Sequence, residues 1–153
     1  MTAAEIRAAI TNDSAVLALM PDTVAITAAL SAGRITLTLT MITERRILSV
    51  LGVVAGAVFL DALDAFAAAT LPPEHPLAAY HSGIRRAVGW LNTDDGIDIG
   101  DPTSQAMLDA LAAAGVVTAE SAAIVKSLAR VPAPLSELDV RRAVFADDGT
   151  PLV

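Results

Sequence analysis

Four aspartates lie within eight residues of the chain, at Asp94, Asp95, Asp98 and Asp101. Carboxylate oxygens are the ligands that calcium prefers, so this glycine-containing segment is the first candidate for metal binding. A calcium loop needs oxygen ligands at its first, third and fifth positions and a glutamate further along. Here Gly96 stands at the third position, and no glutamate follows in register. Aspartate and glycine also dominate turns and helix caps. We therefore interpret the segment as a turn followed by a cap, and we predict no metal site.

Two histidines, His75 and His81, are the other possible metal ligands. They are six residues apart, whereas zinc-binding pairs on a helix usually stand four apart on one face. The chain has no cysteine, which excludes thiolate metal sites, disulfides and cysteine nucleophiles. We predict surface or capping roles for both histidines.

The remaining motifs of catalysis and cofactor binding are absent. No serine stands in a Gly-x-Ser-x-Gly turn. The segment Gly52–Gly56 lacks the Lys-Ser/Thr that completes a phosphate-binding loop. The sequence therefore predicts no enzyme and no cofactor.

The net charge and the hydropathy of the chain limit the classes of partner that it can bind. The net charge of −7 repels phosphate backbones, so we expect no nucleic-acid partner. The longest uncharged stretch, Ile47–Leu60, is shorter than the roughly 20 residues that span a bilayer, so we expect no membrane partner either.

The elements that must position any site are mainly helices. The capping box Thr2-x-x-Glu5 begins the first, and Asp101-Pro102 begins another with a cap and an N1 proline. Pro76 is expected to open a further helix that runs to about Leu91. In all we predict a small mainly α domain of seven to nine short helices. Helix starts are also expected at Asn12–Asp13, Asp22, Thr43, Thr118 and Ser136.

The chain is expected to form a single helical domain over residues 1–145. The break at Leu71–Pro73 suggests possible subregions 1–71 and 76–145, and residues 146–153 read as an extended tail. Aromatic residues make up only 3% of the chain, so the core must consist of aliphatic side chains. The stretch from Val54 to Ala69 has the strongest amphipathic pattern, with its apolar face at Phe59, Leu60, Leu63 and Phe66.

One segment, residues 34–42, alternates threonine with large aliphatic residues and reads as an extended strand. A lone strand leaves backbone groups unpaired, so it must be covered or paired. The segment can pair with Val116–Val117, with the tail at Pro151–Val153 or with another protein chain. It can also be an extended connector laid across the helices of its own chain. We predict an interface with another chain on the aliphatic face, formed by Ile35, Leu37, Leu39 and Met41.

Several phrases of the sequence together resemble a family of small uncharacterised proteins encoded among the late, virion-forming genes of tailed bacteriophages. They include Ala28–Arg34, Met41–Gly52, Leu71–Leu77, Gly96–Pro102, Leu108–Val116 and Val131–Leu135. The likeness covers most of residues 20–145 and carries no catalytic motif.

The resemblance implies a structural component of the virion, in the head, neck or tail, that is assembled in the cytoplasm of the bacterial host. Such a protein acts through contacts with other virion proteins, and we expect a homo-oligomer. The alternative is a phage assembly chaperone or a lysis-associated factor that is not retained in the particle.

Overall fold

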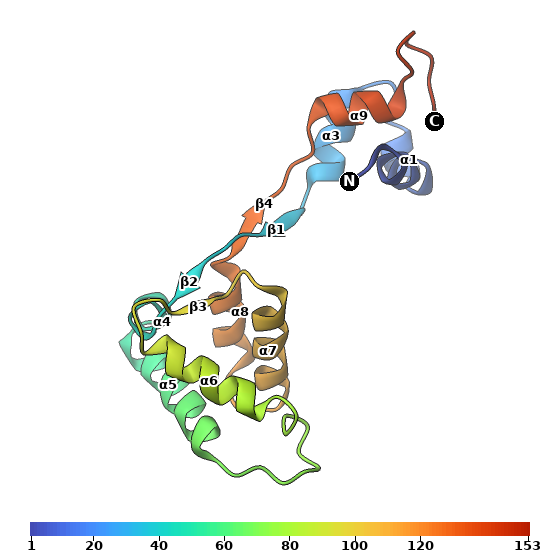
Figure 1. Cartoon of the computed structure of the whole chain (residues 1–153). Coiled ribbons are helices and arrows are strands. Elements are labelled where there is room, and N and C mark those ends of the chain that lie inside the picture. Colours follow the sequence, from blue (N-terminus) through green and yellow to red (C-terminus); the bar gives the residue numbers. More distant parts are fainter. The chain divides into compact units, whose positions relative to one another are not determined.

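The computed structural model describes residues 1–153 and is mainly helical, with nine helices and four short strands (Figure 1). This confirms the predicted fold class, including the extended segment near residues 34–42. The helices are α1 (Ala3–Asn12), α2 (Ser14–Leu17), α3 (Thr23–Ser31), α4 (Glu44–Leu51), α5 (Val53–Ala68), α6 (His81–Leu91), α7 (Pro102–Ala113), α8 (Ala119–Ser127) and α9 (Glu137–Val144). The strands are β1 (Ile35–Leu37), β2 (Met41–Ile42), β3 (Ile97–Asp98) and β4 (Arg130–Pro132).

The chain divides into two compact units. The smaller unit combines Met1–Thr36 with Val131–Val153, and the larger unit is the continuous segment Leu37–Arg130. This division differs from the subregions 1–71 and 76–145 expected from the proline break. The reason is that α9, at the end of the chain, packs against α1 and α3 near its start.

The smaller unit has its own aliphatic core. Helices α1, α2, α3 and α9 bury a cluster of seven residues, Ile6, Ile10, Val16, Ile26, Val140, Ala143 and Val144. Each of these helices is too short to be stable alone, so the unit depends on packing across the two ends of the chain.

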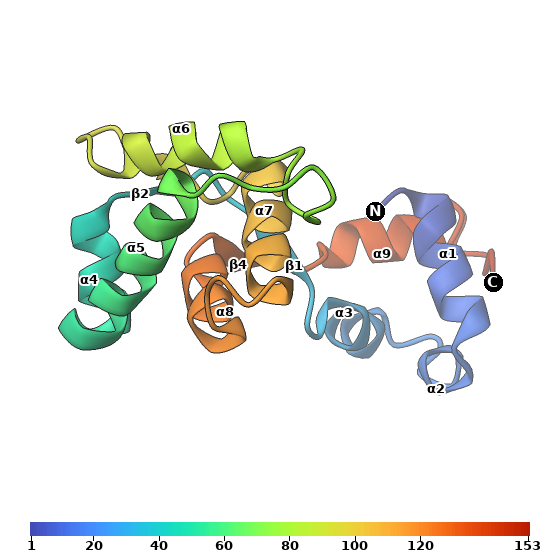
Figure 2. The same cartoon turned by 90° about the horizontal axis from the view of Figure 1, so that it is seen from below.

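The larger unit contains the remaining five helices. Figure 2 shows α4 and α5 on one side, α7 and α8 on the other, and α6 lying across both pairs. The expected apolar face of α5 is confirmed, because Phe59, Leu60, Leu63 and Phe66 are all buried in the core of this unit. The core also takes Ile47 from α4.

Most helices begin where the sequence predicts. The Thr2–Glu5 capping box is formed, and the side chains of Asp22 and Asp101 accept bonds from the first backbone N–H groups of α3 and α7. One start is wrong: α6 begins at His81 rather than at Pro76. The intervening residues form consecutive turns instead, with hydrogen bonds such as Ala78 N–H to His75 C=O.

The strands pair within the chain, in two separate two-stranded sheets. β1 pairs with β4, and β2 pairs antiparallel with β3, with Met41 opposite Asp98 and Ile42 opposite Ile97. Neither Val116–Val117 nor Pro151–Val153 is the partner of the segment 34–42. The partners are the proline-rich segment after α8 and the aspartate-rich segment before α7.

A proline can belong to β4 because of where the ladder bonds fall. Ala133 N–H donates to the Arg34 carbonyl at 3.1 Å, and Thr38 N–H donates to the Ala129 carbonyl at 2.9 Å. On the β4 side the bonded residues, Ala129 and Ala133, are therefore odd-numbered. The nitrogen of Pro132, which has no hydrogen to donate, faces away from β1.

The tail 146–153 is not extended, contrary to expectation. Gly149 adopts a φ of +84°, Ala146 N–H donates to the Thr150 carbonyl, and a bridge joins Phe145 to Pro151. The Asp148 carboxylate also accepts bonds from the Thr150 N–H and hydroxyl. This local turn returns the chain end to the smaller unit, where Val153 packs against the core.

None of the nine helices combines the length and the apolar composition that crossing a membrane requires.

Candidate functional site

The aspartate-rich segment is a structural turn held by its own carboxylates. Asp98 Oδ1 accepts the N–H groups of Thr40 and Gly100, both at 2.8 Å. Asp101 Oδ1 accepts the N–H groups of Thr103 and Ser104 and so caps α7. Two of the four carboxylates therefore hold backbone amides. No three His, Asp or Glu side chains gather closely enough to hold a metal ion.

The two glycines of this segment allow it to approach residues 38–42. A Cβ on Gly100 would lie 2.0 Å from the Thr38 carbonyl oxygen, and one on Gly96 would lie 2.2 Å from that of Ile42. The sequence features that stood out separately, the alternating segment and the aspartate-rich segment, thus form one structural unit. Thr40, Asp98 and the β2–β3 pairing hold them together.

Asp101 provides a test of the capping role. Hydrogen bonds from the side chain and the backbone of Thr103, and from the backbone of Ser104, hold the pKa of Asp101 below its ordinary value of 3.8. A depressed pKa means that this stabilisation is complete above pH 3.8 and is lost as the pH falls through the folded-state pKa. Asp101→Ala should therefore lower the melting temperature at pH 7, and the difference from wild type should shrink in acid. Thermal unfolding followed by circular dichroism checks this.

Asp95→Ala is the matched control, since Asp95 is exposed and accepts no hydrogen bond. We expect its melting temperature to equal that of wild type at every pH. A constant difference for Asp101→Ala down to the lowest pH would contradict the role of the carboxylate.

The histidines take structural roles around Phe66. His81 Nε2 lies 2.9 Å from the Phe66 carbonyl oxygen, and its ring packs edge-on against the Phe66 ring. His75 Nδ1 accepts the Leu77 N–H at 3.1 Å. Since one nitrogen of each ring is used in this way, the pair ties the turns before α6 to the end of α5.

The four predicted interface residues differ in how far their side chains are exposed. Leu37 is half-buried and packs against the core of the larger unit. Leu39 is 75% exposed and Met41 43% exposed, both in the larger unit, and Ile35 of the smaller unit is also exposed. Three of the four side chains are therefore accessible, while the backbone of the segment pairs within the chain.

A second set of exposed aliphatic side chains lies on α5. Val53, Val54 and Val58 follow its N-terminus, and Val54 is 80% exposed. Val54 and Val58 are four residues apart and share one helical face, which is opposite the buried Phe59 and Leu63. The α5 valine patch is defined by these three residues.

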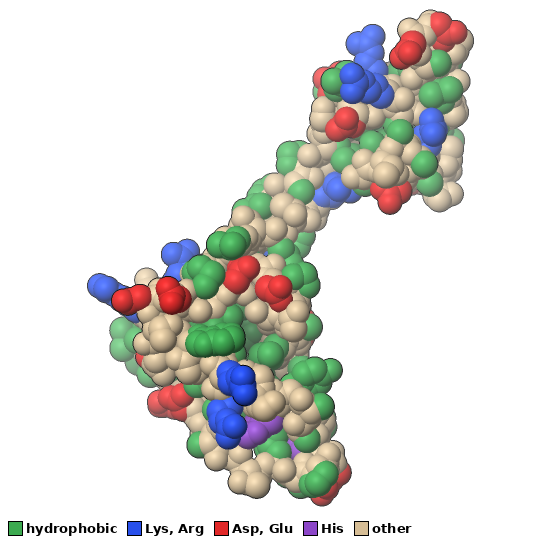
Figure 3. Space-filling view, in the orientation of Figure 1, with side chains coloured by type: hydrophobic (Ala, Val, Ile, Leu, Met, Phe, Trp, Pro, Cys, Tyr) green, Lys and Arg blue, Asp and Glu red, His purple; other side chains and the backbone are tan.

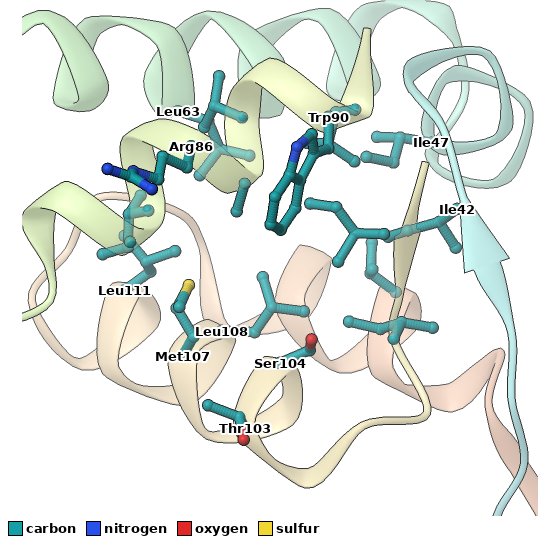
Figure 4. Close-up of a pocket in the computed structure, with 18 of the residues that line it drawn as sticks. Ile42, Ile47, Leu63, Arg86, Trp90, Thr103, Ser104, Met107, Leu108 and Leu111 are labelled. Carbon is teal, nitrogen blue, oxygen red and sulfur yellow. The ribbon is translucent and has the colours of Figure 1, made fainter. Parts of the chain in front are cut away.

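The larger unit also has a cavity of about 310 Å³ that is open to solvent on one side. Its wall is almost entirely apolar and comes from β2 to α8, with contributions such as Ile42, Ile47, Phe59, Leu63, Met107 and Leu108. Figure 4 shows the Trp90 indole standing over the cavity and the Arg86 guanidinium at its edge. In Figure 3, hydrophobic side chains surround a hollow over α6 and α7, with cationic side chains beside it.

A second hollow, of about 530 Å³, belongs to the smaller unit and has a more polar wall. It lies between Pro21, the exposed side of α9 and the returning tail, and includes Arg141, Arg142 and Asp147.

Comparisons with protein-family models, with curated proteins and with solved structures find no match to this chain. The chemistry of the cavity therefore rests on its lining residues alone.

The sequence did not predict the cavity. Ile84, Val88 and Leu91 mark the buried side of α6 by their spacing, and Trp90 is the only tryptophan of the chain. These signals predict a packed helix. A cavity depends on the volumes that several elements leave between them, and no local pattern encodes that difference.

Proposed function

We propose that this chain is a non-enzymatic structural component of a tailed-bacteriophage virion, which acts through protein–protein assembly in several copies. The proposal takes its biological setting from the resemblance of the sequence phrases between residues 28 and 135. It takes its mechanism from the exposed aliphatic side chains. Its place in the cell is the host cytoplasm during assembly and the particle afterwards.

The observation that carries the mechanism is the exposure of Leu39 on a fixed backbone. Leu39 lies between Thr38, whose N–H is bonded to Ala129, and Thr40, whose N–H is bonded to Asp98. The backbone on both sides of Leu39 is already fixed by hydrogen bonds. Little backbone conformational entropy is therefore lost when a partner covers this side chain. Met41, held by the β2–β3 pairing, continues the same surface.

The contact differs from the addition of a strand to a lone partner. β1 and β2 each have a strand neighbour in the chain, so a partner can pair only with the other edge of each strand. Burial of Leu39 and Met41 supplies the affinity, and the α5 valine patch offers a separate surface for a further copy or another virion protein. A stable interface of this kind buries about 1,200–2,000 Å² in total.

Quantitative mass spectrometry of purified particles tests the proposal. We expect the protein at a fixed, stoichiometric copy number, and we expect Leu39→Asp to reduce its incorporation about tenfold, because the charge must be desolvated at the centre of an apolar contact. The protein produced with the variant should remain folded, since Leu39 is exposed.

Thr38→Asp is the control, as Thr38 is exposed in the same segment and contributes no large apolar side chain to a contact. Its incorporation should match wild type. Absence of the wild-type protein from purified particles would overturn the proposal and favour the assembly chaperone or lysis-associated factor. Equal incorporation of the two variants would remove Leu39 from the interface.

A further inference from the structure

The cavity of the larger unit is more than a packing irregularity. Protein interiors leave few voids larger than one water molecule. The volume of this cavity is about 310 Å³, and one side of it is open to solvent. The volume stands at the lower end of the range typical of small-molecule sites, about 300–1,000 Å³. The space therefore suits the apolar part of a small ligand.

The wall specifies the chemistry of most of that ligand. Side chains of Phe59, Leu63, Met107 and Leu108 offer no hydrogen-bonding group beyond a weakly accepting sulfur, so the enclosed part must be a hydrocarbon chain or ring. Trp90 stands over the space with 57% of its surface exposed (Figure 4). A large aromatic side chain that is held over an apolar cavity and not buried in it can close over a ligand.

Arg86 specifies the other end of the ligand. It lines the cavity from α6, its side chain is exposed, and Figure 4 shows the guanidinium at the edge of the space. The ion pair of this structure joins Lys126 to Asp109, so the Arg86 guanidinium has no carboxylate partner. In a chain of net charge −7, a free cation beside an apolar cavity selects a ligand with one anionic group.

We propose that this cavity is a binding site for a small amphipathic anion of the medium-chain carboxylate class. The hydrocarbon chain occupies the space under Trp90, and the carboxylate pairs with Arg86 at the edge. The interaction is independent of the virion role, because it uses none of Leu39, Met41 or the α5 valine patch.

Trp90 provides the readout, since the chain has no other tryptophan. The folded wild-type protein is titrated with sodium decanoate, and in parallel with 1-decanol, at concentrations below micelle formation. We expect a saturable change in Trp90 emission and reduced quenching by acrylamide as the ligand covers the indole. No saturable change with decanoate would overturn the proposal.

Two glycines of α6 make a matched pair for testing the location. A Cβ on Gly83 or on Gly89 would meet nothing within 4 Å, but only Gly83 lines the cavity. Gly83→Leu should fill the space and weaken decanoate binding at least tenfold, while Gly89→Leu should bind as wild type does. Both changes favour the helix, so both variants should fold, and circular dichroism checks this. Equal binding by the two variants would overturn the location.

Two arginines test the anionic end. Arg86→Gln should weaken decanoate binding about threefold, as expected for an exposed ion pair, and leave decanol binding unchanged. Arg85→Gln on the same helix does not line the cavity and should change neither. If Arg85→Gln and Arg86→Gln have the same effect on decanoate, the assignment of the carboxylate to Arg86 is wrong.

Discussion

Val140→Asp should unfold the smaller unit and leave the larger one folded. Val140 is fully buried among the aliphatic side chains of α1, α3 and α9, where a carboxylate finds no partner. Burying that charge should cost about 4 kcal/mol, which is a large part of the stability of a small domain. We expect the circular dichroism signal to lose about a third of its helical amplitude, the share contributed by α1, α2, α3 and α9.

Trp90 emission reports on the larger unit in this experiment, because Trp90 lies in that unit. Its emission should remain that of the wild-type protein in Val140→Asp. Leu138→Asp is the control on the same helix: Leu138 is exposed, so the change should stay within about 0.5 kcal/mol. Loss of the native Trp90 emission in Val140→Asp would show that both units unfold in one cooperative step.

Gly100→Ala should have the second largest effect, and in the larger unit. The added methyl group would lie 2.0 Å from the Thr38 carbonyl oxygen, and a backbone atom cannot move aside as a flexible side chain can. Relief of the contact must separate residues 38–40 from the aspartate-rich turn and break the bond between Thr40 N–H and Asp98. We expect a loss of about 3 kcal/mol in the free energy of unfolding, measured in urea by Trp90 emission.

Gly89→Ala is the matched control for that substitution. Gly89 is exposed on α6 and has no neighbour within 4 Å of an added Cβ, so alanine should stabilise the helix by about 0.8 kcal/mol. The two Gly→Ala changes should therefore have opposite signs. A Gly100→Ala variant as stable as wild type would mean that the turn and the segment 38–42 are not held closely together.

The positions of the helices could be predicted because their signals are local. The Thr2–Glu5 box and the Asp101-Pro102 start each satisfy backbone N–H groups within three residues. Each cap can therefore be recognised as a short motif in the sequence. The same holds for the buried face of α5, whose spacing repeats with the helical period. The predicted helix start at Pro76 was wrong because a proline fits a turn as well as the first position of a helix.

The partners of the strands could not be predicted, because pairing is a long-range property. Thr40 bonds to Asp98, and Arg34 to Ala133, across separations of 58 and 99 residues. The alternation in residues 34–42 indicates an extended chain but does not say which backbone lies opposite. The proline of β4 made this strand harder to predict, since only the register shows that Pro132 faces away from the bonded edge.

The sequence by itself determined the helical class, the caps, the buried face of α5 and the absence of a recognisable catalytic motif. Each of these depends on residues within a turn or two of one another. Only the tertiary structure decided that the two chain ends form one unit, that the aspartate-rich turn holds the segment 38–42, and that a cavity opens beneath Trp90. Those outcomes depend on close packing between elements that are distant in the sequence. The effect of a missing Cβ, or of an unpaired Arg86, depends on the residues that the fold places beside it.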